Sequence, residues 1–221
     1  MRTWLAAALL LSATGALADD EVTHLFASAA SRGNVHRVIV DVPSGEVTVK
    51  NGPADRISVS GEIRRSYDGH REREKEQRIA NDINLVIDVN GDQAVIRRQF
   101  GPNASSWSAR SWHTNYKITV EVPRGLDLDV ETRYGELNVD GDFGNINADL
   151  RAGEIHLRTP RANVRELNAS VRVGEVHADV GDVREDHEGL FPGRTRFYNA
   201  SGKSTINVHT TAGEVHVTLT R

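Results

Sequence analysis

Residues 151–157 read Arg-Ala-Gly-Glu-Ile-His-Leu, and this stretch decides the fold because its central phrase recurs along the chain. Gly-Glu followed by an aliphatic residue begins at five glycines: Gly45, Gly135, Gly153, Gly174 and Gly213. The last four are separated by 18, 21 and 39 residues (135 to 153, 153 to 174, 174 to 213), or one, one and two periods of roughly 20. This period predicts an all-β fold, a single β-solenoid domain of stacked short strands with about 20 residues per coil.

The residues around each glycine predict a turn between two strands. Glycine adopts positive φ without a Cβ penalty, so a strand can end, turn a corner and restart there. After each glycine, apolar and polar residues alternate, as in a strand with one buried face. The alternation predicts that these residues face inward: Val139, Ile146, Ile155, Leu157, Val164, Val176 and Val215. A β-sandwich is the alternative, because frequent turn signals also mark that fold, but sandwich strands have no reason to repeat one turn at a fixed period.

Three copies of the phrase extend to Arg-x-Gly-Glu, starting at Arg133, Arg151 and Arg172. Coils stacked about 4.8 Å apart would bring the Glu residues into one column and the Arg residues into a second column beside it. Because a column of carboxylates alone would repel itself, we expect Arg and Glu to interleave as a surface ladder of ion pairs, each worth about 0–1 kcal/mol. On this interpretation Arg-x-Gly-Glu is structural.

Histidine follows the Glu by two positions in three copies, at His156, His177 and His216. Residues i and i+2 of a strand share a face, so stacked coils would align imidazoles beside carboxylates, ligands that suit Zn, Cu or Ni. The three histidines are therefore candidate metal ligands. Against this, a coil without His is expected between residues 174 and 213, and would break the column. Histidine on a strand face is also ordinarily a solvated polar residue, and no cofactor is otherwise indicated.

The first 18 residues have the features of a secretory signal peptide. Arg2 is followed by a short apolar stretch and by Ala16-Leu17-Ala18, an A-x-A cleavage site. The apolar run is too short to span a bilayer, and no later stretch is long enough, so no transmembrane segment is expected after cleavage. We therefore expect an exported protein, periplasmic or secreted, that begins at Asp19.

Three segments depart from the repeat. Residues 19–34 lack clean periodicity and are expected to be a lead-in to the domain at 35–221. A helix is expected near 70–82, where charged residues are followed by two isoleucines four positions apart. Residues 185–202, rich in glycine and proline, are expected to be a loop insertion.

Residues 101–114 form a loop that resembles nothing else in the chain. It holds Trp107 and Trp112, with Arg110 between them. Trp is favoured at interaction sites, so these residues are candidates for binding a glycan or protein partner. The alternative is that the tryptophans cover the open end of the core.

Composition excludes several classes of function. Removing Arg2 with the signal changes 27 basic and 31 acidic residues to 26 and 31, a net charge of −5, which argues against nucleic-acid binding. The absence of cysteine excludes disulfides, lipidated cysteine and thiolate catalysis. Aromatic residues make up only 5% of the chain, which is low for a stacking platform for sugars.

An enzyme of stacked coils would be a polysaccharide lyase or hydrolase. Glycoside hydrolysis requires two carboxyl groups about 5–9 Å apart. Acidic residues are plentiful on the expected strands, at Asp127, Asp129, Glu131, Asp140, Asp142 and Asp149. Acidic residues at alternate positions of an exposed face are equally what solubility needs. No Ser-His-Asp pattern, phosphate-binding loop or metalloprotease helix is present.

The order of these elements resembles the DUF4097 family, bacterial exported domains of unknown function that are labelled adhesins. The likeness is carried by Val-Asp-Val-Pro-Ser-Gly-Glu-Val-Thr-Val at 40–49, Val-Glu-Val-Pro-Arg-Gly-Leu-Asp-Leu at 120–128, and the Gly-Glu turns up to Thr-Ala-Gly-Glu-Val at 211–215. The resemblance implies a β-helical fold, an envelope setting and surface interactions without a defined partner. The tryptophan loop departs from the family pattern.

Together these observations predict a non-catalytic envelope or secreted protein, an adhesin-like interaction or structural module with an unidentified protein or glycan partner. A carbohydrate-active β-helix enzyme is the alternative.

Overall fold

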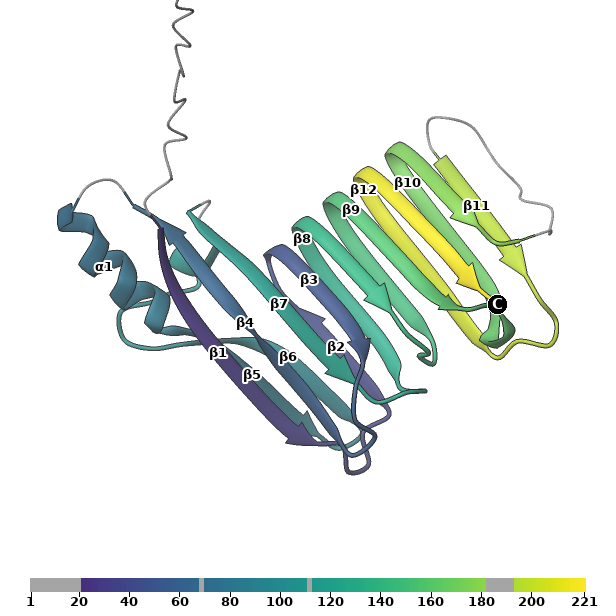
Figure 1. Cartoon of the computed structure of the whole chain (residues 1–221), viewed down its shortest axis with the longest axis horizontal. Coiled ribbons are helices and arrows are strands. Elements are labelled where there is room, and N and C mark those ends of the chain that lie inside the picture. Colours follow the sequence, from purple (N-terminus) through teal and green to yellow (C-terminus); the bar gives the residue numbers. More distant parts are fainter. Residues whose placement is uncertain (1–20, 68–69, 111–112, 182–192) are drawn as a thin grey trace, which may run out of the picture.

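The computed structural model describes residues 21–67, 70–110, 113–181 and 193–221, in which twelve strands form one sheet (Figure 1). The strands of the first half are β1 (Glu21–Ser31), β2 (Arg37–Asp41), β3 (Ser44–Asn51), β4 (Arg56–Ser66), β5 (Ile83–Asn90), β6 (Gln93–Phe100) and β7 (Thr114–Val122). Those of the second half are β8 (Asp127–Asp140), β9 (Ile146–Pro160), β10 (Val164–Asp179), β11 (Gly193–Tyr198) and β12 (Ser204–Thr220). The helices are α1 (His70–Asn81) and the short 3-10 turns η1 (Ser108–Arg110) and η2 (Arg161–Asn163). None of the described helices is long and apolar enough to cross a membrane.

The second half is a β-solenoid, as the sequence predicts. Strands β8, β9, β12 and β10 lie side by side, parallel and in register, so that equivalent residues of the repeat are direct neighbours. Each strand bends at its glycine and forms both walls of a coil (Figure 1). The seven aliphatic residues predicted to face inward are all buried, which confirms the prediction from the alternation of apolar and polar residues.

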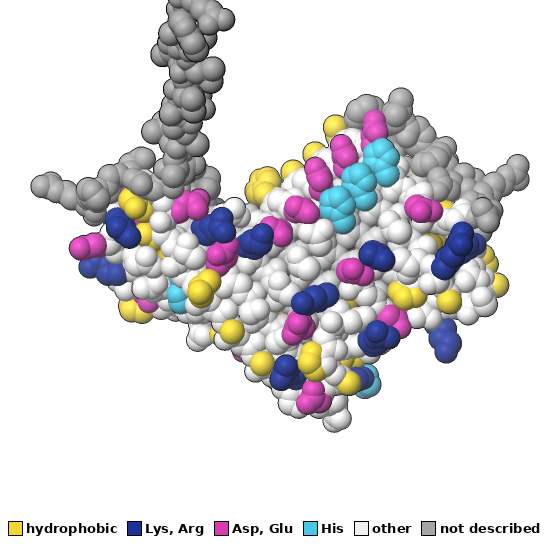
Figure 2. Space-filling model, in the orientation of Figure 1, with side chains coloured by type: hydrophobic (Ala, Val, Ile, Leu, Met, Phe, Trp, Pro, Cys, Tyr) yellow, Lys and Arg dark blue, Asp and Glu magenta, His cyan; other side chains and the backbone are white. Residues whose placement is uncertain are grey.

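Strands β8, β9, β10 and β12 continue through their glycines instead of ending there, which corrects the expected break; β3 begins at Ser44, directly before Gly45. Strand β8 is hydrogen-bonded to its neighbours on both sides of Gly135, where φ is 125°. Equivalent glycines lie in one column, and a Cβ on Gly135 would overlap the carbonyl oxygen of Gly45. Two physical demands therefore select glycine at this corner, a positive φ and the close approach of the next coil. The Glu residues that follow the glycines form a surface row beside the histidines (Figure 2).

The first half divides the same sheet into two layers. The first part of β8 pairs with β2, while its second part pairs with β3. From there β3, β7, β4 and β1 continue one layer, and β2, β6 and β5 continue the other. One hydrophobic core joins both halves. The molecule is thus an all-β solenoid whose N-terminal end resembles an open sandwich.

The coils do not stack in sequence order, and this corrects the expectation of an intervening coil between 174 and 213. Strand β12, the last in the chain, lies between β9 and β10 and pairs with both. Gly213 is consequently the direct neighbour of Gly153 and of Gly174. No described strand separates the copy at 174 from the copy at 213.

Two further segments differ from their expected structure. The expected lead-in contains β1, which pairs antiparallel with β4 along its whole length. Its alternation was hidden because small Ala and Ser residues occupy the last five of its eleven positions, although Val22 and Phe26 are buried. The expected insertion at 185–202 contains β11, which pairs antiparallel with β10. The expected signal peptide at 1–18 lies outside the described residues, whereas the helix near 70–82 is confirmed as α1.

Candidate functional site

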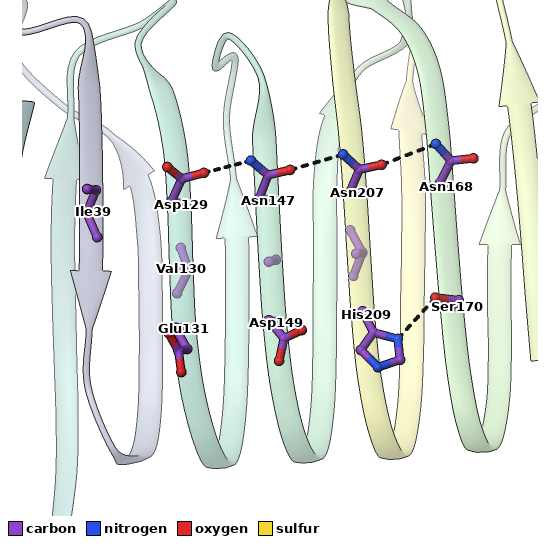
Figure 3. Close-up of a pocket in the computed structure, with 12 residues that line it drawn as sticks. Ile39, Asp129, Val130, Glu131, Asn147, Asp149, Asn168, Ser170, Asn207 and His209 are labelled. Atoms are coloured by element: carbon purple, nitrogen blue, oxygen red, sulfur yellow. Dashed lines mark hydrogen bonds between the residues drawn. The ribbon is translucent and has the colours of Figure 1, made fainter.

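A shallow polar furrow crosses the coils on the wall that precedes the glycine corner (Figure 3). One side is a row formed by Asp129, Asn147, Asn207 and Asn168, and the other is a row formed by Glu131, Asp149, His209 and Ser170. Members of the two rows lie two residues apart on each strand, so the rows are about 6.6 Å apart. The furrow has a volume of about 680 Å³ and is open to solvent, and Ile39 of β2 lies at one end.

The first row is a continuous ladder of side-chain hydrogen bonds (Figure 3). The Nδ2 of Asn168 donates to the Oδ1 of Asn207 (3.2 Å), and the Nδ2 of Asn207 donates to the Oδ1 of Asn147 (3.0 Å). The Nδ2 of Asn147 then donates to the Oδ1 of Asp129 (2.7 Å), whose other oxygen lies 3.5 Å from the Nε of Arg37. The ladder fixes each amide in one orientation across four coils.

The second row is less constrained. The Nδ1 of His209 lies 3.1 Å from the Oγ of Ser170. Glu131 and Asp149 are register neighbours on β8 and β9, and both are exposed. Within the described residues no hydrogen bond or ion pair holds either side-chain carboxylate. This row therefore presents two free acceptor groups beside the ordered ladder.

Charge changes sign along the furrow. Its β8 and β9 end carries Asp129, Glu131 and Asp149. At the opposite end, the register continues the two rows onto Arg196 and Arg194 of β11, which are exposed. A ligand lying along the stacking direction would meet carboxylates first, then amides, then guanidinium groups.

The furrow could have been found in the sequence. Asp129, Asn147, Asn168 and Asn207 each lie six positions before the glycine of their copy. This constant spacing places the four residues at equivalent positions of neighbouring coils. The sequence analysis named Asp129 among the acidic residues but did not connect it with the three Asn residues at the same spacing.

The geometry gives limited support to catalysis. Asp127 and Asp129, which the sequence offered as possible acids, accept hydrogen bonds from Asn145 and Asn147, so they fix the turn and the ladder. Glu131 and Asp149 remain as a neighbouring pair on an exposed face. A general acid in glycoside hydrolysis is usually set by an apolar pocket, which this open wall does not provide.

The three candidate metal ligands are brought together on the opposite wall. Ring centroids are 4.8 Å apart between His156 and His216, and 4.9 Å apart between His216 and His177. The rings are nearly parallel, at 9° and 17°, and they form the unbroken row seen in Figure 2. As the side chains stand, no three described His, Asp or Glu groups converge on one metal position.

The expected ladder of Arg-Glu ion pairs is wrong. In the described ranges none of Arg133, Arg151 and Arg172 forms an ion pair with a Glu of the repeat. Four of the five Glu residues instead contact the residue two positions later, as between Glu154 and His156 (3.3 Å), whereas Glu46 pairs with Lys117 (3.0 Å). The corner explains this, because it separates the Arg on one wall from the Glu on the other.

The tryptophan loop lies near the helical end of the molecule, away from the furrow. Trp107 is 80% exposed, so its indole does not cover the core. Arg110 ends η1, but its side chain is not described, and Trp112 lies outside the described residues. The loop is held by Tyr116, whose hydroxyl donates to the carbonyl of Ala109 (2.9 Å).

The model of the Toastrack DUF4097 family matches residues 38–218. The chain belongs to this family. The match spans β2 to β12, so the Toastrack domain includes both the two-layered half and the solenoid.

Among solved structures, the chain is similar to a "putative cell adhesion protein" from Clostridium sporogenes ATCC 15579, with 13% identity, a TM-score of 0.48, and coverage of 91% of this chain and 100% of that chain. It is also similar to a "putative adhesin" from Parabacteroides merdae ATCC 43184, with 8% identity, a TM-score of 0.29, and coverage of 87% and 80%. No curated protein matches the chain. At these values the similarities carry no conclusion about function.

Proposed function

We propose that this Toastrack protein is an exported, non-catalytic binding module of the cell envelope or its surroundings, and that its furrow binds a glycan chain. The observation that carries the proposal is the ladder from Asp129 to Asn168, because it holds polar groups in fixed positions at a constant spacing. Export is supported by the signal-peptide pattern of residues 1–18.

The ladder leaves hydrogen-bonding capacity for a ligand. An amide has two N–H groups and an oxygen with two lone pairs. Asn147 and Asn207 each use one N–H and one lone pair within the ladder, so each keeps a donor and an acceptor. Glu131 and Asp149 add free acceptors. Sugar hydroxyl groups both donate and accept, and they match this mixture.

The residue types favour a glycan over a protein partner at this wall. Protein interfaces are enriched in aromatic residues, Met and Arg, and depleted in Asp, Glu and Ser. The residues that line the furrow are mostly Asp, Glu, Asn and Ser, and they include no Trp, Tyr, Phe, Met or Arg. Because it has no Trp, Tyr or Phe for stacking, binding rests on hydrogen bonds, and weak affinity at each site is expected.

Affinity electrophoresis through gels that contain neutral or acidic polysaccharides tests the proposal on the mature chain. We expect retardation by at least one glycan, and its loss in the double variant Asn147→Ala, Asn207→Ala. The matched control is Asn138→Ala, which removes a half-buried Asn of the opposite wall whose Nδ2 donates to the Oε1 of Glu136 (2.9 Å). Retardation unchanged in the double variant, or lost equally in the control, would contradict the furrow as the site.

A further inference from the structure

The histidine row is a consequence of the stacking order, because β12 brings His216 between His156 and His177. If the coils were stacked in sequence order, His216 would lie beside only one of the other two histidines. The row lies on the wall after the glycine corner, so it is separate from the furrow. Any ligand it takes is independent of the proposed glycan site.

Each imidazole already has the partner that commonly supports a metal ligand. The Nε2 atoms of His156, His216 and His177 lie 3.3, 3.1 and 3.4 Å from an Oε2 of the Glu two residues earlier. A carboxylate accepts, so a neutral imidazole carries its proton on Nε2 and keeps a lone pair on Nδ1. Metal-binding histidines characteristically donate their other N–H to a carboxylate, which fixes the tautomer and raises ligand basicity.

The spacing of neighbouring rings is close to the span of a bound ion. A metal–imidazole bond is about 2.0–2.1 Å long, so two nitrogens on one ion lie at most about 4.2 Å apart. The ring centroids are 4.8 and 4.9 Å apart, and the rings are parallel. Because the lone pair of an imidazole nitrogen lies in the ring plane, a shared ion requires neighbouring rings to rotate out of their parallel stack until their Nδ1 lone pairs converge. The side chains are 36–52% exposed, which leaves room for this movement.

The surroundings favour a cation. Glu136, Glu154, Glu214 and Glu175 form a carboxylate row directly beside the imidazoles (Figure 2). The basic residue nearest in register is Arg158, two positions after His156, and Asp179 occupies the equivalent position after His177. Carboxylates thus outnumber basic side chains around the row.

We propose that the row His156, His216 and His177 binds one divalent transition-metal ion between neighbouring imidazoles, with His216 as the ligand common to both possible pairs. Imidazole suits Cu²⁺, Ni²⁺ and Zn²⁺, and the general order of stability places Cu²⁺ first. The bound ion links two coils that are distant in sequence, and Glu214 positions His216 by accepting its Nε2 proton.

Titration of the tag-free mature chain with CuCl₂, followed by calorimetry and electron paramagnetic resonance, tests this site. We expect one Cu²⁺ per chain and a spectrum with two coupled nitrogens. Glu214→Gln lowers the affinity about 10- to 100-fold. His216→Gln lowers it further, and leaves no spectrum with two coupled nitrogens. His156→Gln retains the pair of His216 and His177 and keeps two nitrogens.

His209→Gln is the matched control, because His209 lies on the same strand but on the furrow wall. It should leave affinity and spectrum unchanged. The proposal is overturned if Cu²⁺ binds His216→Gln as it binds the unaltered chain, if His209→Gln is equally impaired, or if no Cu²⁺ binds. Circular dichroism on each variant separates loss of the ligand from loss of the fold.

Discussion

Gly213 lies against Gly153 in the neighbouring coil, and a Cβ on Gly213 would overlap the carbonyl oxygen of Gly153. The same relation repeats along the column, so Gly153 is held against Gly135 and Gly174 against Gly213. The φ angles at these glycines are 125–138°. The corner of every coil therefore has no room for a side chain.

The first prediction is that Gly153→Ala or Gly174→Ala destabilises the protein by more than the cost of positive φ alone. Backbone strain costs about 1–3 kcal/mol, and the overlap adds to it because the adjacent coil must move. The free energy of unfolding in urea measures the loss. Gly91→Ala is the matched control, since Gly91 has a φ of 63° and open space around it. An equal loss at Gly91 and Gly153 would show that close stacking contributes nothing.

The second prediction concerns the buried pair Arg65 and Glu76, which joins β4 to α1. Arg65 is 4% exposed, and its Nε donates to the Oε2 of Glu76 (2.7 Å) while its Nη1 donates to the carbonyl of Ser108 (2.8 Å). Glu76→Ala leaves the guanidinium buried without its charge partner, so we expect a loss of about 3–5 kcal/mol.

Chemical denaturation measures this loss, and Asp88→Ala provides the comparison. Asp88 pairs with Arg97 on the surface, where such pairs are worth about 0–1 kcal/mol. Similar losses at Asp88 and Glu76 would contradict the role of burial.

The third prediction is a loss of stability at alkaline pH caused by Tyr116. Burial raises the pKa of Tyr116 to about 12, although the charges of Arg98 and Arg65 lower it in part. Because the folded pKa lies above the unfolded value of about 10, the contribution is complete below pH of about 10 and is lost as pH rises toward 12. The difference between the folded and unfolded pKa values of Tyr116 corresponds to a contribution of up to about 3 kcal/mol to the free energy of unfolding.

Unfolding measured across this pH window should show a smaller decline in Tyr116→Phe than in the unaltered chain. Tyr134→Phe is the control, because Tyr134 is 54% exposed. A decline of the same size in all three proteins would exclude Tyr116 as its source.

The fourth prediction is that Trp107 is available to a partner. In a Trp112→Phe background, Trp107 is the one tryptophan left after removal of the signal. Its fluorescence should be quenched efficiently by iodide, since the indole is 80% exposed. Trp107→Ala should change the free energy of unfolding by less than about 0.5 kcal/mol, as surface substitutions usually do. A shielded indole or a large loss of stability would assign it to the core.

The sequence by itself determined which residues of each coil face the core. Alternation of apolar and polar residues is a local property, so it identified Ile155, Leu157 and Val215 as core residues and predicted a solenoid. The helix at α1 was also predictable from local spacing. The same reasoning extends to Asn147 and Asn207, because their constant distance from the glycine places them at equivalent positions of their coils.

Only the tertiary structure decided which coils are neighbours. Every copy presents similar backbone edges and a similar core face, so the local pattern is equally compatible with β12 beside β9, β10 or both. The choice depends on the entropy of closing the long connections and on hydrogen bonding at both edges of the strand. Neither of these can be predicted from a local sequence period. That choice places His216 between His156 and His177, and completes the ladder through Asn207. Both candidate binding surfaces therefore contain residue types supplied by the repeat, in an order set by the tertiary fold.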